Sequence, residues 1–408
     1  MGGSRYHQMN PSIVKNILTL RYLPTKNTII PKLSWEDFTE KNTHNSATIV
    51  EKSIKDAIRN EIGHSKKRIC VALSGGIDST LILAIIRDVF PDITINAISV
   101  KFAGSSDESE KAAKIARKFY ANHYVLHIEN YLQELPAAIG IIKLPFWDLH
   151  WYHVVKKAKS LSNILISGDG ADELFGGYTF RYEKFLSLTT SNSSPTEKVK
   201  AYLQCHERDW VPDQEKLFDR KTKFSWNQIN KMLEHYFDNP LPPLAQVFLA
   251  DFNGKLLFNW LPLNSKFHKY FEVKAVLPIL SSDLISYAAH IPYHLKYSNR
   301  KKLGKILLRK MLRKYVPNSL ISPKKLGFSV DTLNLWKSHG RKLCHYYLSD
   351  ARVVKEGWIN KDWVTSHLSK IETNMDVRYV NKLLGILAFE IWFRLFITKE
   401  MKSSVKLL

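Results

Sequence analysis

The stretch Val71-Ala-Leu-Ser-Gly-Gly-Ile-Asp-Ser-Thr80 joins an apolar run to the start of an apolar helix. Its paired glycines, Gly75 and Gly76, allow a sharp turn and a close approach of the backbone to a ligand. The next helix offers free N–H groups and the positive end of its dipole, which favour a phosphate. Asp78 beside such a site suits a bridging Mg²⁺ ion. The hydroxyl donors of this first loop are Ser74, Ser79 and Thr80.

Taken alone, these residues also fit an ordinary strand-to-helix turn with a polar N-cap. The loop is not a Walker A loop, because no Gly-Lys-Ser/Thr follows its glycines.

Working outward from the loop, β-type runs alternate with helical periods. The predicted strands are 68–73, 93–102, 123–128 and 163–167, and the predicted helices are 49–62, 79–89 and 108–120. This alternation predicts an α/β fold with a parallel sheet of about five strands flanked by helices. Ligands of such sheets bind at the carboxyl ends of the strands.

Beyond residue 187 the β-type signal fades, and the polar stretch Thr189–Pro195 is typical of a loop. The remainder has helical periods and ends in an apolar helix at 381–397. We therefore expect an N-terminal tail (1–45), an α/β lobe (46–190) and a mainly helical lobe (191–408).

The composition excludes a disordered chain, since 45% of the 408 residues are hydrophobic. Lys and Arg number 60 against 38 Asp and Glu, a formal charge of +22, which raises the question of a nucleic-acid or membrane partner. Three distant cysteines indicate neither a disulfide framework nor a zinc site. The first residues have no signal-peptide core, and Glu390 and Arg394 interrupt the most apolar stretch. We expect a cytoplasmic protein without a membrane span.

A second glycine loop, Ser167-Gly-Asp-Gly-Ala-Asp-Glu-Leu-Phe-Gly-Gly-Tyr178, follows the fourth predicted strand. We expect it to face the first loop across the sheet edge. Asp172 would then complete a Mg²⁺ shell with Asp78, and Asp169 would orient or deprotonate an attacking amine. The plainer alternative is a solvated acidic turn.

The two loops resemble known motifs. Residues 74–79 resemble the SGGxDS loop of the N-type ATP pyrophosphatases, and residues 167–178 resemble the signature of the synthetase domain of asparagine synthetase B. The resemblance implies an adenine nucleotide alpha hydrolase-like fold, with ATP and Mg²⁺ as cofactors. It also implies an amide-forming ligase that activates a carboxylate, by default aspartate, as an acyl-adenylate. Ammonia or another amine would then displace AMP.

The resemblance extends over most of the chain. It covers 22–29, 97–102, 107–108, 145–148, 304–309, 324–328 and 387–394. The nucleotide contacts that it implies include Leu73, Val100, Ser167 and Gly168. It assigns to Lys305 the stabilisation of charge on the transferring phosphate. The alternative for Lys305 is a solvated basic helix face, since 302, 305, 309 and 313 share a face at helical spacing.

Two departures from the family pattern bear on the substrates. Gly2 stands where full-length members of the family carry the nucleophilic cysteine of an N-terminal glutaminase domain, and only about 45 residues precede the lobe, short of a typical domain. We therefore expect the chain to lack a glutaminase domain. We expect ammonia, a separate glutaminase or a substrate amine as the nitrogen source. Lys274, Val276 and Ser281 stand where the family carries Glu, Arg and Asp. We expect these residues to lie beside the active site, where the reversed charge puts aspartate in doubt as the substrate.

Three alternatives therefore stay open. A specialised ligase would form an amide or ring with an internal amine. A tRNA-modifying or RNA-binding pyrophosphatase would use the positive charge, although no recognised nucleic-acid motif supports it. A basic surface would also suit an acidic partner, such as a nitrogen donor.

Overall fold

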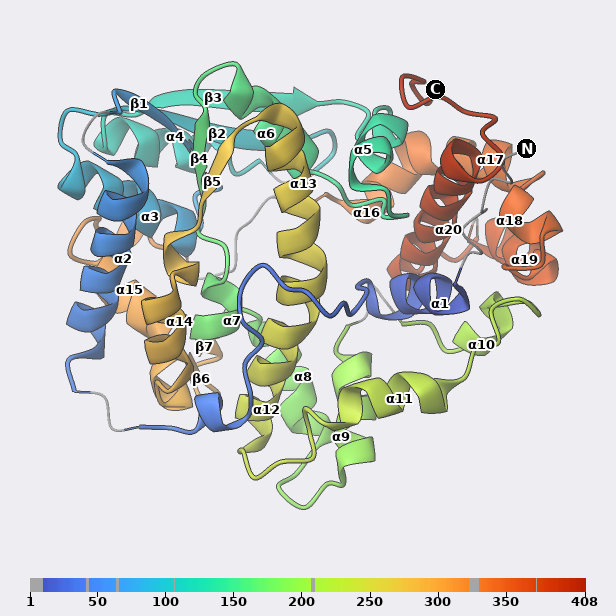
Figure 1. Ribbon diagram of the computed structural model, residues 1–408, viewed down its shortest axis with the longest axis horizontal. Coiled ribbons are helices and arrows are strands. Elements are labelled where there is room, and N and C mark those ends of the chain that lie inside the picture. The colour runs from blue at the N-terminus through green and yellow to red at the C-terminus, as the bar shows by residue number, and fades with distance from the viewer. Residues whose placement is uncertain are drawn as a thin grey trace, which may run out of the picture.

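Five parallel strands form one sheet in the computed structural model, seen at the upper left of Figure 1. The strands are β1 (Arg68–Ala72), β2 (Thr94–Phe102), β3 (Asn122–Ile128), β4 (Ile164–Ile166) and β5 (Lys274–Val276). Their order is β3-β2-β1-β4-β5. The predicted α/β class and strand number are confirmed. The fifth strand comes from the helical second half of the chain and pairs with β4, from Ile164 opposite Lys274 to Ile166 opposite Val276.

The structure describes residues 10–41, 44–63, 66–105, 107–206, 210–322, 330–371 and 373–408. Alternate strand residues enter two different hydrophobic cores. Ile69 and Val71 of β1 pack with one group of helices, while Cys70 and Ala72 pack with the other. This alternation follows from the two-residue period of a strand, and the sheet is therefore covered on both faces.

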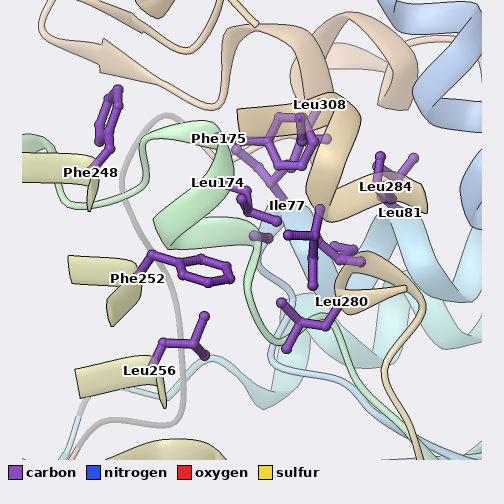
Figure 2. Close-up of a cluster of buried hydrophobic side chains, with 14 of the residues drawn as sticks. Ile77, Leu81, Leu174, Phe175, Phe248, Phe252, Leu256, Leu280, Leu284 and Leu308 are labelled. Carbon is purple, nitrogen blue, oxygen red and sulfur yellow. The ribbon is translucent and has the colours of Figure 1, made fainter. Parts of the chain in front are cut away.

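The helices of the first core share one hydrophobic cluster with Ile69 and Val71 of β1 and with Ile164 and Ile166 of β4. They include α2 (Ser46–Ile62), α3 (Ile77–Val89), α4 (Ser109–Lys118), α7 (Ala171–Phe175), α8 (Thr179–Leu188), α9 (Pro195–Gln204), α11 (Trp226–Glu234), α12 (Pro243–Asp251), α14 (Ser282–Ala289) and α15 (Ile306–Leu312). Figure 2 shows Leu174 and Phe175 of α7 among side chains of α3, α12, α14 and α15. Residues from both halves of the chain thus support the second loop.

The helices of the second core cover the opposite face and extend away from it. They are α1 (Pro11–Leu20), α5 (Leu135–Ile142), α6 (Trp151–Lys159), α10 (Gln214–Leu217), α13 (Leu261–Phe271), α16 (Thr332–Leu335), α17 (Arg341–Leu348), α18 (Arg352–Lys355), α19 (Lys361–Lys370) and α20 (Val377–Phe396). In Figure 1, α20 lies among α1, α16, α17 and α19, away from the sheet. The division into lobes at residue 190 stays a prediction.

The apolar helix predicted at 381–397 is α20, which is buried against its neighbours. Glu390 is fully buried and accepts hydrogen bonds from the Val353 N–H at 3.0 Å and from Arg394 at 2.6 Å. The charges that interrupt the apolar stretch are therefore internal partners of one another. In the part of the chain that the structure describes, every helix is too short or too polar to cross a lipid bilayer.

Two predicted elements differ from the structure. The helix expected from residue 79 begins at Ile77, so Asp78 lies in its first turn. The alternative of a basic helix face from 302 onward is wrong, because a hairpin of β6 (Tyr297–Ser298) and β7 (Leu303–Gly304) occupies this region and α15 begins at Ile306. Lys302 belongs to the hairpin turn, and Lys305 occupies the N-cap position of α15.

A π-helix, η2 (Phe252–Trp260), joins α12 to α13 without a break. Such wide turns are rare and are found often at functional sites. Here the π-helix ends at Trp260, whose ring lies 5.3 Å from that of His150 and 5.7 Å from that of Trp151.

Candidate active site

The two glycine loops meet at the point where the strand order reverses. From β1 the chain proceeds to β2 and β3 on one side, whereas β4 and β5 lie on the other side. Loops at such a switch point leave a crevice between them, which is the usual ligand position in open α/β sheets. A Cβ placed on Gly168 would lie 2.8 Å from the Cβ of Asp78, so the loops are in direct contact. The predicted juxtaposition is confirmed.

The first loop satisfies part of its own hydrogen bonding. Gly75 has a φ of +73°, which a residue with a side chain rarely adopts. The Ser74 amide donates to Ser79 Oγ at 3.2 Å, and the two hydroxyls are 3.2 Å apart. Thr80 is buried and donates its hydroxyl to the Gly76 carbonyl at 2.6 Å. Ser79 is also buried and donates its hydroxyl to the Gly76 carbonyl at 3.4 Å, so Ser74 is the hydroxyl of this loop best placed to donate to a ligand.

The backbone of Leu73 is hydrogen-bonded within the sheet, whereas Val100 lies beyond the end of the neighbouring strand β1. Leu73 donates its N–H to Ile98 at 2.8 Å and accepts the Ser99 hydroxyl at 2.5 Å. Since backbone groups alternate in direction along a strand, Val100 points its N–H and C=O to the same side as Ile98. On that side β1 has already ended, because Ala72 is its last residue and pairs with Ile98. The N–H and C=O of Val100 on this side of β2 could therefore pair with a flat ring that carries one hydrogen-bond acceptor and one donor.

One ammonium group joins the two loops. Lys305 Nζ donates to Asp78 Oδ2 of the first loop and lies 2.6 Å from Asp172 Oδ1 of the second. The lysine side chain is only 7% exposed. Burial lowers its pKa, but the charges of Asp172 and Asp78 outweigh burial and leave the pKa well above the ordinary value. Lys305 is therefore a fixed positive charge between two carboxylates.

The backbone around Lys305 fixes its direction. Lys305 has a φ of +54°, unusual for a residue with a side chain, and directly precedes α15. Its N–H donates to the Phe175 carbonyl at 3.1 Å, which ties the β6–β7 hairpin to α7. A Cβ on Gly177 would come within 1.6 Å of Asp172 Oδ1 and 2.5 Å of Lys305 Cε. Only glycine fits there.

Asp169 is the third carboxylate of the site. It accepts the Ser167 hydroxyl at 2.8 Å and a hydrogen bond from the Trp260 side chain. Burial raises its pKa, and the nearby Asp78 and Asp172 add to this; these effects exceed the two hydrogen bonds and bring the pKa to about 6. A carboxyl with that pKa can take up and release a proton near neutral pH.

Sequence reasoning did not identify Trp260, which reaches Asp169 from the end of the π-helix. Trp260 is separated from the second loop by more than 80 residues, and no motif marks it. The remaining acidic residue of the loop, Glu173, accepts the Tyr178 hydroxyl at 2.7 Å and is buried. The second loop is therefore not a solvated acidic turn.

The three departures from the family pattern fall at different places. Lys274 is exposed at the amino end of β5 and forms an ion pair with Glu61 at 2.7 Å. It therefore does not reverse a charge beside the loops, contrary to our expectation. Val276 is buried and accepts the Ser167 N–H at 3.2 Å, and Ser281 follows Leu280, which packs on Gly170. The predicted turn at 324–328 lies outside the described residues.

The donor set suits Mg²⁺ held together with a phosphate ligand. Across the described ranges, histidine, cysteine and acidic side chains do not gather in any group of three or more that could hold a metal ion alone. Asp78 and Asp172 both reach one Lys305 nitrogen, so their oxygens converge. One or two carboxylates with substrate phosphates are the usual protein share of a Mg²⁺ shell.

Strand order and switch-point loops define an α/β protein, and the convergent charges mark a candidate ligand site between its two glycine loops. Comparison with known families agrees: the asparagine synthase family model matches residues 50–394. The chain therefore belongs to the asparagine synthase family.

The individual proteins that this chain resembles share at most about a third of its residues over the aligned parts. The chain is 26% identical over 388 residues to asparagine synthetase [glutamine-hydrolyzing] 1 of Bacillus subtilis (strain 168), covering 86% of this chain and 60% of that protein. A putative asparagine synthetase [glutamine-hydrolyzing] 2 of Methanocaldococcus jannaschii is 30% identical over 112 residues, covering 26% of this chain and 22% of that protein. The NMN synthetase structure of Francisella tularensis overlaps 52% of this chain and 94% of its own at 13% identity, with a TM-score of only 0.27.

Proposed function

We propose that the protein is an ATP-dependent ligase that joins a carboxylate to an amine through an acyl-adenylate. The observation that carries the proposal is the ammonium of Lys305, held between one carboxylate from each glycine loop beside Asp169. Family membership supports the same class of reaction.

In the first step, a carboxylate oxygen of the substrate attacks the α-phosphorus of ATP. The bond from that phosphorus to the bridging oxygen of pyrophosphate breaks, and pyrophosphate leaves. We assign the pyrophosphate to the Gly75–Gly76 turn and the start of α3, and the adenine ring to the edge at Val100. We also assign Ser167 and Gly168, at the start of the second glycine loop, as contacts of the nucleotide. Lys305 offsets the charge that develops on the phosphate oxygens.

Asp78 and Asp172 would hold Mg²⁺ with the phosphates. The ion would supply further neutralisation of phosphate charge. The carboxylates themselves contribute the position of Lys305, because both contact its nitrogen.

In the second step, an amine attacks the carbonyl carbon of the acyl-adenylate, and the carbon–oxygen bond to AMP breaks. The nitrogen must lose a proton as the amide forms. Asp169 is assigned as the acceptor, since its pKa of about 6 leaves it largely ionised at neutral pH. We propose aspartate as the acid and ammonia as the amine, which the family suggests.

Product analysis tests this proposal. The protein is incubated with ATP, Mg²⁺, ammonium and aspartate labelled with ¹⁸O in the side-chain carboxylate. We expect AMP and pyrophosphate in equal amounts, with one ¹⁸O atom transferred to AMP. Release of ADP and phosphate, or unlabelled AMP, would contradict the acyl-adenylate route. Parallel reactions with other acids show whether aspartate is preferred.

A further inference from the structure

The first turn of α4 packs directly on the first glycine loop. A Cβ on Gly75 would lie 3.4 Å from the Ala112 nitrogen, 3.6 Å from Lys111 Cγ and 3.7 Å from Lys111 Cβ. The stem of Lys111 therefore lies against the turn that we assign to pyrophosphate. The flexible four-carbon side chain of Lys111 is long enough to bring its ammonium group over this turn.

Lys111 differs from the other lysine of the same helix surface. Lys114 is 55% exposed and pairs with Glu110 at 3.1 Å. Lys111 is partly buried and, among the described residues, makes no ion pair. The ammonium group of Lys111 has therefore lost part of its hydration without forming an ion pair with a described residue, although the charge of Glu108 acts on it.

A second cation stands near Lys111. Arg309 is buried and donates to the Gly304 carbonyl at 2.9 Å and to the Ser322 carbonyl at 2.7 Å, which fixes its guanidinium. Burial lowers the pKa of Lys111, Glu108 partly opposes this, and the charge of Arg309 lowers it further. The charges of Lys111 and Arg309 repel each other, and an anion bound between them would relieve that repulsion.

We infer that Lys111 binds the terminal phosphates of ATP, the part that leaves as pyrophosphate. The inference rests on the proposed function, because it assigns a further contact within the same site. Lys111 reaches the site from α4, whereas Lys305 reaches it from the hairpin before α15. The leaving group would thus be held from both sides of the first loop.

Calorimetric titration of the full chain with Mg²⁺-pyrophosphate, and separately with AMP, tests the inference without requiring turnover. Lys111→Met keeps the apolar stem and removes the charge. We expect pyrophosphate binding to weaken about tenfold, as for one charge-assisted hydrogen bond, with AMP binding unchanged. Lys111→Arg should keep binding within about threefold, and Lys114→Met, the matched control, should match the wild type.

Equal pyrophosphate affinity in the wild type and Lys111→Met would overturn the inference. So would an equal loss of AMP and pyrophosphate binding, or an equal loss in Lys114→Met. If the wild type binds pyrophosphate in a Lys111-dependent way but yields ADP and phosphate from ATP, the subsite stands and the proposed reaction fails. If the wild type binds no pyrophosphate, the subsite is refuted, and product analysis decides the reaction separately.

Discussion

At the residue scale, two opposing sets of interactions set the protonation of Asp169. Burial and the neighbouring carboxylates raise its pKa, while hydrogen bonds from Ser167 and Trp260 lower it, with a balance at about 6. If Asp169 accepts the proton, it must be ionised, so kcat should rise with pH through about 6 and level off above.

The variant Trp260→Phe removes one interaction that lowers this pKa. We expect the acid limb of the kcat profile to move to higher pH by up to about one pH unit, since one pH unit corresponds to about 1.4 kcal/mol. Trp363→Phe is the matched control, because Trp363 donates to Asp213 at 2.9 Å. If the acid limb of the kcat profile stays at the same pH in Trp260→Phe, Trp260 does not affect the pKa of Asp169.

The ion pairs of Lys305 permit a second test. Asp172→Asn leaves the lysine with one charged partner and removes a carboxylate from the phosphate side. We expect pyrophosphate release to fall by about 10²- to 10³-fold, as for loss of one charge-stabilising group. Glu173→Gln on the same helix should keep at least about a tenth of the activity, because Glu173 contacts Tyr178 instead. Similar losses in both variants would point to damage of α7 as a whole.

Much of this residue-level arrangement could be predicted from sequence, because the motifs carry it. Asp78 and Asp172 each follow a glycine loop, and parallel strands bring such loops to one edge. Trp260 could not be predicted in this way, since its approach depends on the packing of a helix from another part of the chain.

At the element scale, the second loop depends on two close approaches. Gly170 has a φ of +87° and packs on Leu280, and Gly177 leaves room for Asp172 and Lys305. Gly177→Ala places a methyl group where the Asp172 carboxylate lies. We expect turnover to fall by at least about 10²-fold, since small misplacements of reacting groups carry such penalties.

Gly63→Ala is the control for this variant. Unlike Gly177, Gly63 has a positive φ, of +69°, but a Cβ there meets no described atom within 4 Å, so this variant introduces backbone strain without a steric clash. This control should lose about 1 kcal/mol of unfolding free energy and keep full activity. Denaturant unfolding and kinetics on both variants separate backbone strain from steric displacement. A fully active Gly177→Ala would contradict the packing of the loop on Lys305.

The elements also show where sequence patterns are insufficient. Strands β1 to β4 could be predicted because they alternate with helices, but β5 has three residues and lies within a helical region. The charge spacing around Lys305 suggested a helix, whereas a hairpin closed by β6 and β7 was found. Tertiary contacts to Phe175, and not local propensity, decide the backbone at Lys305.

At the scale of the whole molecule, segments far apart in sequence build the site. Residues 74–80, 168–177 and 304–309 meet at one edge of the sheet. Binding of Mg²⁺-ATP should therefore slow amide exchange in all three segments together. Hydrogen exchange with mass spectrometry checks this, with α19 as an internal reference. Protection confined to 74–80 would mean that the second loop and the hairpin do not share the ligand.

The π-helix before Trp260 has a consequence for how the chain tolerates length changes. A residue removed from Phe252–Trp260 would let the wide turns close to α-helical ones and rotate everything beyond by about 100°. Trp260 would swing away from Asp169, and α13 would present the wrong face to α6. Point changes there alter one contact, whereas a single-residue deletion alters the phase of the whole helix. The rotational register of this helix, more than any one side chain in it, keeps Trp260 directed at Asp169 and α13 packed on α6.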